Sequence, residues 1–211
     1  ELPMMQLYRI VANLVYWTAF KYFWFRSTTD ELWAGRLLTE LPAKADIWMH
    51  AASVGEVRII SHLLDYLRSV DPTLTYHITV MTRTGYQTAK SACGDIAQVS
   101  YFPFDVSMLW RKFLDRMQPR IVVIAETEIW PNLIETLESR KIPVVLVNGR
   151  LSEKAHGRYI FVRGPIGKLL STYDHLFLKG REDHKRYRDL GVPETKMTLA
   201  GDMKFDAPLV E

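Results

Sequence analysis

The chain is poor in cysteine and lacks the common metal-binding motifs. Cys93 is the single cysteine among 211 residues, so no internal disulfide can form and no thiolate cluster is available for zinc. The sequence also contains no HExxH and no CxxC. One cysteine fits a reducing compartment such as the cytosol. We therefore predict no bound metal.

A large excess of charge and a dinucleotide fingerprint are missing as well. The formal net charge is +3, which is too small to indicate a nucleic-acid partner. A dinucleotide-binding turn would need G-x-G-x-x-G after the first predicted strand, and Gly55 is the only glycine at that turn. NAD and FAD are therefore disfavoured, and we predict no cofactor.

The chain starts with a long apolar and aromatic run from Leu7 to Phe25. A membrane span needs about 20 predominantly apolar residues, and here Arg9, Asn13 and Lys21 interrupt the run. In a helix these polar residues fall within one arc, which leaves a broad apolar face. We predict that residues 1–27 form a membrane-associated helix lying in the interface. A true span and a helix packed on the protein's own core are the alternatives.

Beyond this helix, short β-rich runs alternate with stretches of helical periodicity, as in an α/β fold. The predicted strands are 46–50, 76–81, 99–102, 120–125, 143–147, 175–178 and 196–200. The apolar run from Ile121 to Ala125 has no polar alternation, which is typical of a parallel strand covered on both faces. We predict a Rossmann-like, doubly wound parallel sheet over residues 46–211, after a connector at 28–45. Ligands of such sheets bind at the loops that follow the strands.

Carboxylates stand in two of these loops. Glu56 follows the first strand at the start of a helix, where a carboxylate also favours the helix N-terminus without any catalytic role. Glu126 and Glu128 follow the most hydrophobic strand. They could serve as acid and base groups or bind a cation, or one could cap a helix while the other pairs with an arginine.

The remaining strand-end loops carry groups that suit an anion. Arg150 could hold a phosphate or a carboxylate, or pair with a strand-end glutamate. Thr82 and Thr84 could offer hydroxyls to an anion or simply cap the next helix. Lys204, after the last strand, could neutralise a negative group. The candidate acceptor- or phosphate-binding residues are Ser53, Gly55, Thr82, Thr84, Glu128, Asn148 and Arg150.

Taken in order, these loops resemble those of one family. The motifs are Ser-Val-Gly-Glu at 53–56, Thr-Arg-Thr-Gly at 82–85, Pro-Phe-Asp at 103–105, Glu-Thr-Glu-Ile-Trp-Pro-Asn at 126–132, Asn-Gly-Arg-Leu-Ser at 148–152 and Gly-Asp-Met-Lys-Phe-Asp at 201–206. They look like those of the 3-deoxy-D-manno-octulosonic acid (Kdo) transferases, over about residues 46–206. The block at 126–132 is the most specific of them.

The resemblance implies the N-terminal half of a GT-B glycosyltransferase, in which two Rossmann-like domains face each other across a cleft. This half would receive a lipid A precursor, and the C-terminal domain would hold CMP-Kdo. By matching motifs, Glu56 would be the general base, while Glu126 and Lys204 would stabilise the transition state. The enzyme would invert the anomeric centre without a metal, at the cytoplasmic face of a bacterial inner membrane. Without the donor domain, these 211 residues are expected to be inactive.

Three other hypotheses remain open from the sequence. One is a GT-B transferase with another acceptor, and a second is a catalytically silent lipid-binding module. The third is a flavodoxin-like domain that binds a free nucleotide or flavin.

Overall fold

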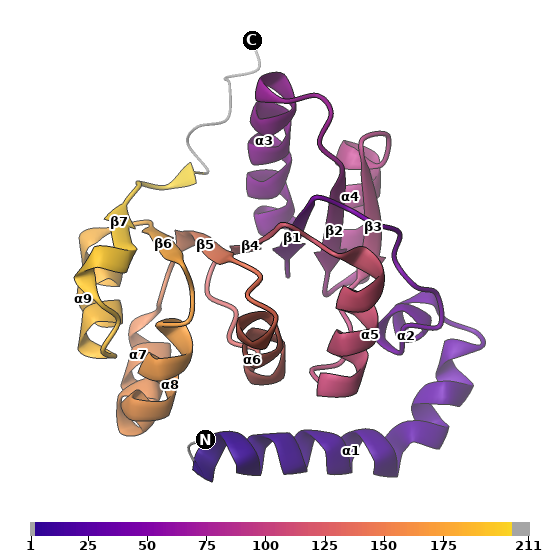
Figure 1. The fold of residues 1–211 in the computed structure, drawn as a ribbon, viewed down its shortest axis with the longest axis horizontal. Helices are drawn as coiled ribbons and strands as arrows, with labels where there is room; N and C mark the ends of the chain where they lie inside the picture. Colours follow the sequence, from indigo (N-terminus) through magenta and orange to yellow (C-terminus); the bar gives the residue numbers. More distant parts are fainter. Residues whose placement is uncertain (1–2, 204–211) are drawn as a thin grey trace.

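A sheet of seven parallel strands forms the centre of the molecule in the computed structural model, which describes residues 3–203 (Figure 1). The strand order is β3-β2-β1-β4-β5-β6-β7. The strands are β1 (Ile47–Ala51), β2 (Tyr76–Val80), β3 (Ala97–Tyr101), β4 (Ile121–Ala125), β5 (Val144–Gly149), β6 (His175–Leu178) and β7 (Met197–Leu199). Each of them overlaps a predicted strand, and the predicted Rossmann-like parallel sheet is confirmed.

Helices cover both faces of this sheet, so it is doubly wound. The helices are α1 (Pro3–Ser27), α2 (Glu31–Arg36), α3 (Val54–Val70), α4 (Arg83–Cys93), α5 (Ser107–Met117), α6 (Pro131–Ser139), α7 (Glu153–Tyr159), α8 (Arg163–Leu170) and α9 (Arg181–Asp189), with short 3-10 turns η1 (Ile160–Val162) and η2 (Glu194–Lys196). α3 and α4 lie on one face, and α5, α6, α8 and α9 lie on the other (Figure 1).

Two apolar cores follow from the alternation of side chains along the strands. On the α5 and α6 side, Trp48 of β1 packs with the rings of Trp110 and Phe113 from α5, and all three are fully buried. On the α3 and α4 side, Met49 and Ile78 are fully buried among aliphatic side chains. Because both faces are covered, the central strand β4 is apolar throughout, as its sequence predicted, while β1 and β2 also bury His50, His77 and Thr79.

The strand order reverses between β1 and β4. β1 pairs with β2 on one side and with β4 on the other, and all the pairings are parallel. The chain therefore leaves β1 and β4 in opposite directions across the sheet, and the loops after these two strands open side by side. Ligands of open α/β sheets bind at such a switch point. The topology thus brings the loop that carries Glu56 next to the loop that carries Glu126.

Helix α1 lies along the outer side of the α5 and α6 layer (Figure 1). Polar contacts fix it there: the Tyr8 hydroxyl donates to Asp105 at 2.9 Å, and Arg9 forms an ion pair with Glu135 of α6. Tyr16 is buried against the core. The helix also presents an exposed apolar surface, made by Leu7, Ile10, Val11, Leu14, Val15, Trp17, Tyr22, Trp24 and Phe25. Within residues 3–203, no helix combines the length and the apolar character needed to cross a membrane.

Candidate functional site

Glu56 sits in the first turn of α3, where it forms a capping box. Its carboxylate accepts hydrogen bonds from the backbone N–H of Ala52 at 2.6 Å and from the Ser53 hydroxyl at 2.7 Å. The Ser53 hydroxyl in turn accepts from the Glu56 backbone N–H. This is close to the reciprocal arrangement expected at a helix start, except that the carboxylate accepts from the N–H of Ala52, one residue before the N-cap Ser53. The structural role that the sequence left open is therefore real, and it holds the carboxylate in one orientation.

Glu126 lies directly after β4 in an unusual backbone conformation. Its φ is +56°, in the left-handed region that residues other than glycine and asparagine rarely adopt. Its backbone N–H donates to Val147 of β5 at 2.9 Å, which fixes the turn against the neighbouring strand. Such a conformation costs about 1–3 kcal/mol and concentrates at functional sites. This left-handed conformation turns the chain sharply where β4 ends.

Several of the predicted residues line one open cavity. It has a volume of about 340 Å³ and lies at the carboxyl ends of the strands. Its lining residues are Glu56, Glu126, Thr127, Glu128, Arg150, Leu151, Ser152, Ala155 and Tyr159. Three carboxylates and one guanidinium thus face the same space, although they come from three loops that are distant in the sequence.

Glu128 carries the clearest electrostatic signature in this cavity. Burial of its side chain raises its pKa from the ordinary value of 4.5 to about 7, and the negative charge of Glu56 adds to the rise. The nearby indole N–H of Trp130 opposes the shift, and the charge of Glu126 raises the pKa further. A carboxyl group with such a pKa can hold or release a proton near neutral pH.

The loop that carries Arg150 is held by α9, which the sequence analysis did not connect with the site. Asp183 accepts from the backbone N–H of Leu151 at 2.8 Å, and the Arg186 guanidinium donates to the Leu151 carbonyl at 2.9 Å. Tyr187 of α9 contacts the loop after β4 in the same way, since its hydroxyl lies 2.6 Å from that of Thr127. No local signal marks these α9 residues, because their partners lie more than 30 residues away in the sequence.

The Arg150 side chain itself is exposed and forms no ion pair with any residue from 3 to 203. The sequence left open whether Arg150 would pair with a strand-end glutamate. Within the described part of the chain it does not, so its guanidinium is available to an anionic ligand. The Thr127 hydroxyl donates to the Arg150 carbonyl and ties the two loops together.

Asn148 connects the end of β5 with the segment that leads to Lys204. Asn148 is fully buried, has a φ of +52°, and accepts a hydrogen bond from the backbone N–H of Met203. The register between β5 and β6 shifts at this point, which re-aims the end of β5. An ion pair of 2.5 Å between Lys179 and Asp202 holds the same segment. Lys204 lies outside the described residues.

The threonines of the second loop do not line the carboxylate cavity. Thr82 caps α4 by accepting from the Gly85 backbone N–H at 3.0 Å, and the hydroxyls of Thr82 and Thr84 lie 3.3 Å apart. Both residues are exposed. The helix-capping alternative therefore has direct support for Thr82, while an anion-binding role of the two threonines stays a prediction. Ser53 and Gly55 precede Glu56 at the start of α3, and neither of them lines the cavity.

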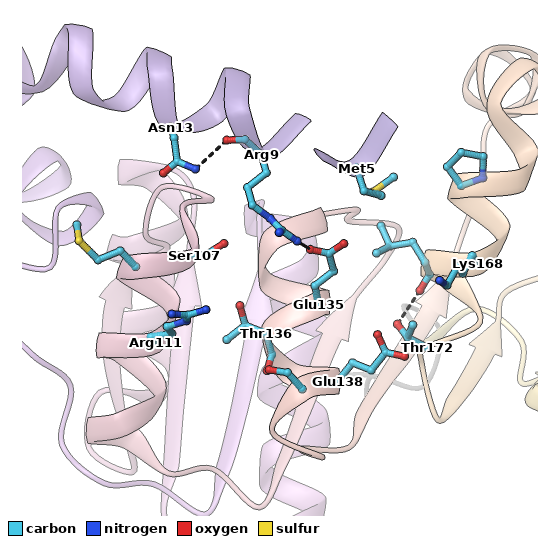
Figure 2. A pocket seen from close by; sticks show the side chains of 14 residues that line it. Met5, Arg9, Asn13, Ser107, Arg111, Glu135, Thr136, Glu138, Lys168 and Thr172 are labelled. Atoms are coloured by element: carbon cyan, nitrogen blue, oxygen red, sulfur yellow. Dashed lines mark hydrogen bonds and ion pairs between the residues drawn. The ribbon is translucent and has the colours of Figure 1, made fainter. Parts of the chain in front are cut away.

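A larger cavity, of about 670 Å³, holds none of the predicted residues. It lies between α1 and the outer surfaces of α5, α6 and α8, away from the strand ends (Figure 2). Figure 2 shows the Arg9 side chain reaching from α1 to Glu135, and Arg111 on the opposite wall. Asn13 donates to the Arg9 carbonyl at 2.8 Å. This cavity shows how α1 is attached, and it is distinct from the carboxylate cavity.

The carboxylate cavity suits proton transfer at a sugar-like hydroxyl next to an anionic group. A fixed carboxylate can accept a proton, a second carboxyl can hold one near neutral pH, and a guanidinium can bind a phosphate or a carboxylate. Among the described residues, no group of histidine, cysteine, aspartate and glutamate side chains is arranged to hold a metal ion. Which of these residues react stays a prediction.

Comparisons with known proteins identify relatives of this chain. Residues 28–207 match the family described as 3-deoxy-D-manno-octulosonic-acid transferase (kdotransferase). A 3-deoxy-D-manno-octulosonic acid transferase of Haemophilus influenzae is 34% identical over 165 residues, which are 78% of this chain and 39% of that protein. The transferase of the same description from Bordetella pertussis is 30% identical over 81% of this chain and 40% of its own. The chain thus spans about two fifths of the length of these relatives.

Among solved structures, a UDP-N-acetylglucosamine 2-epimerase has a TM-score of 0.56 at 12% identity, over 78% of this chain and 48% of that chain. A putative UDP-N-acetylglucosamine 2-epimerase from Listeria monocytogenes has a TM-score of 0.54 at 13% identity, over 76% of this chain and 46% of its own. At these identities the likeness concerns the fold alone.

Proposed function

The chain belongs to the 3-deoxy-D-manno-octulosonic acid transferase family, and we propose that it is the acceptor-binding half of an enzyme that transfers Kdo from CMP-Kdo to a lipid A precursor. The observation that carries this proposal is the cavity in which Glu56, Glu126, Glu128 and Arg150 meet. It lies at the switch point of the sheet, where such folds bind their ligands.

Glu56 is the general base of the proposed reaction. A sugar hydroxyl of the acceptor attacks the anomeric carbon of Kdo, and its proton passes to the Glu56 carboxylate. The new carbon–oxygen bond forms as the bond from the anomeric carbon to the cytidylate oxygen breaks, so CMP leaves and the anomeric centre inverts. The hydrogen bonds from Ala52 and Ser53 orient the carboxylate for this step.

The other charged groups act on the charges that develop in the reaction. Lys204 neutralises the departing phosphate, and it follows Asp202 and Met203, which Lys179 and Asn148 contact. Glu126 faces the positive charge that develops on the sugar ring as the leaving group departs. Arg150 binds a phosphate or carboxylate of the acceptor. CMP-Kdo is held by a second Rossmann-like domain of a GT-B enzyme, so residues 1–211 alone are expected to be inactive.

The lipid acceptor places the reaction at a membrane surface, the cytoplasmic face of a bacterial inner membrane. The exposed apolar side chains of α1 support this location, because a contiguous apolar surface of this kind is typical of a membrane or protein contact. Lipid A precursor, CMP-Kdo and the membrane surface are thus the proposed partners.

The decisive experiment measures transfer by the full-length protein. Purified protein in phospholipid vesicles is incubated with CMP-Kdo and a tetra-acylated disaccharide lipid A precursor. The mass of the lipid product is measured by mass spectrometry. A mass increase of one Kdo residue or more supports the proposal. Absence of the product, with CMP-Kdo intact, would exclude this reaction and favour a silent lipid-binding module. Transfer to a different acceptor in the same assay would favour a transferase of other specificity.

A further inference from the structure

A second, apolar groove lies between α1 and the loops that follow β3 and β4. Its volume is about 270 Å³. On the α1 side it is lined by Tyr8, Val11, Ala12, Val15, Tyr16 and Phe23, and on the other side by Phe104, Asp105, Val106 and Trp130. Val11 and Val15 are about half exposed, so the groove opens at the outer apolar surface of α1.

The one charged group of the groove has its hydrogen-bonding capacity occupied. Asp105 accepts from the Tyr8 hydroxyl, from the Trp110 indole N–H, and from the backbone N–H groups of Asn132 and Leu133. A carboxylate with four donors has little capacity left for a polar ligand. The remaining lining is aliphatic and aromatic, so the groove suits a hydrocarbon chain and disfavours a sugar or a phosphate.

The groove is preformed, because α1 is held firmly at its walls. The rings of Phe23 and Phe104 stack at 4.7 Å, and Phe23 also stacks on Trp33 at 5.3 Å. The ion pair of Arg9 with Glu135 fixes the opposite flank of the helix (Figure 2). Apolar ligands gain affinity from such preformed sites, since little ordering is needed on binding.

Trp130 connects this groove with the carboxylate cavity. Trp130 lines the groove, and Glu128, two residues earlier in the chain, lines the cavity. Both residues belong to the loop that joins β4 to α6. The groove and the carboxylate cavity are therefore both lined by residues of this one loop.

We propose that this groove binds one acyl chain of the lipid acceptor and thereby places the sugar headgroup in the carboxylate cavity. The proposal rests on the function proposed above and assigns to it a lipid-recognition site separate from the exposed face of α1. Membrane attachment concentrates the enzyme at the surface, whereas the groove selects an acylated acceptor. The groove therefore affects the KM for the acceptor more than the turnover number.

Chain binding can be measured without any transfer. The full-length protein is titrated with a bromine-labelled twelve-carbon fatty acid below its micelle concentration, because bromine quenches tryptophan fluorescence on contact. Saturable quenching that is lost in both Trp130→Phe and Ala12→Phe is expected, since Ala12→Phe fills the groove. Thr18→Phe is the matched control: Thr18 is exposed on the same helix, lies outside the groove and is not one of the exposed apolar side chains of α1. Equal quenching in the wild type and in Ala12→Phe would overturn the proposal.

Transfer to two acceptors then tests the link to the reaction. With Ala12→Phe, the KM for a tetra-acylated acceptor is expected to rise about tenfold or more, while transfer to the same disaccharide without acyl chains stays within about twofold of the wild type. Thr18→Phe should leave both unchanged. An equal loss with both acceptors, or no loss with either, would overturn the acyl-chain role. Unfolding midpoints of the three proteins show whether the variants fold.

The two proposals fail in different ways. If the wild type transfers Kdo to neither acceptor, the proposed reaction is wrong, and the quenching titration still decides whether the groove binds a chain. If the wild type transfers Kdo but Ala12→Phe has the same KM and the same transfer rate as the wild type with both acceptors, the reaction stands and the groove proposal is wrong.

Discussion

The side-chain oxygen of Asn148 accepts a 3.1 Å hydrogen bond from the backbone N–H of Met203, so the end of β5 holds the residue that precedes Lys204. Asn148 reaches this position through a left-handed backbone conformation, with a φ of +52°. Asparagine tolerates that conformation better than most residues. One buried amide thus connects two loops that the proposed mechanism needs together.

Replacing Asn148 separates its two contributions. Asn148→Gly keeps the left-handed conformation accessible but loses the hydrogen bond, while Asn148→Ala loses both. We expect Asn148→Ala to lower the free energy of unfolding by about 1 kcal/mol more than Asn148→Gly. Transfer by the full-length enzyme should fall about tenfold in both. Urea unfolding and initial transfer rates check this, and unchanged rates in both variants would remove Asn148 from the site.

Glu56→Gln tests the general base. Glutamine keeps the size of the side chain and can still accept a hydrogen bond, but it cannot take the proton from the acceptor hydroxyl. We expect transfer to fall by about 10² to 10⁴-fold with acceptor affinity nearly unchanged. The weakened cap should cost only about 0.5–2 kcal/mol of stability. Rates and unfolding curves measured on the same preparation separate these effects, and near-normal turnover would leave Glu56 with its capping role alone.

The raised pKa of Glu128 predicts that the free energy of unfolding depends on pH. Its pKa is about 7 in the folded protein, against an ordinary value of 4.5, so the folded state binds more protons between these pH values. Its contribution to stability is fully present below pH 4.5 and is lost as the pH rises through 7. Glu128→Gln stays neutral and should gain about 2–3 kcal/mol over the wild type on going from pH 5 to pH 8.

Urea unfolding of the wild type and of Glu128→Gln at both pH values measures that gain. Glu138→Gln, which changes an exposed carboxyl on α6, serves as the control and should show no such difference. The same stability offset at pH 5 and pH 8 for Glu128→Gln would contradict the raised pKa.

Asp105 should stabilise mainly the sheet domain, through Trp110 and the start of α6, and it adds one contact to α1 through Tyr8. Asp105→Ala leaves four buried or half-buried donors without an acceptor, and we expect a loss of about 3–5 kcal/mol. Tyr8→Phe removes only the contact from α1 and should cost about 0.5–1.5 kcal/mol. Chemical unfolding measures both losses. Equal losses in the two variants would mean that the Trp110 and α6 contacts contribute little.

Much of this protein could be predicted from its sequence, because the patterns concerned are local. The apolar run at β4 and the polar residues after each strand predicted the strands, the parallel sheet and the edge at which to look for a site. The order of the loop motifs indicated the family that the comparisons then showed. Even the capping alternative for Glu56 was visible, because a helix start has a local signature.

Only the tertiary structure decided which of these loops meet. Strand order places β1 beside β4. Long-range packing brings Asp183 of α9 to the Arg150 loop and Tyr187 of α9 to Thr127 in the loop after β4. The same packing leaves Thr82 and Thr84 outside the cavity and forms the groove beneath α1. Side-chain periodicity follows from the few residues around each position. Contacts between distant segments follow instead from how all the apolar faces are buried together, which no single stretch of sequence contains.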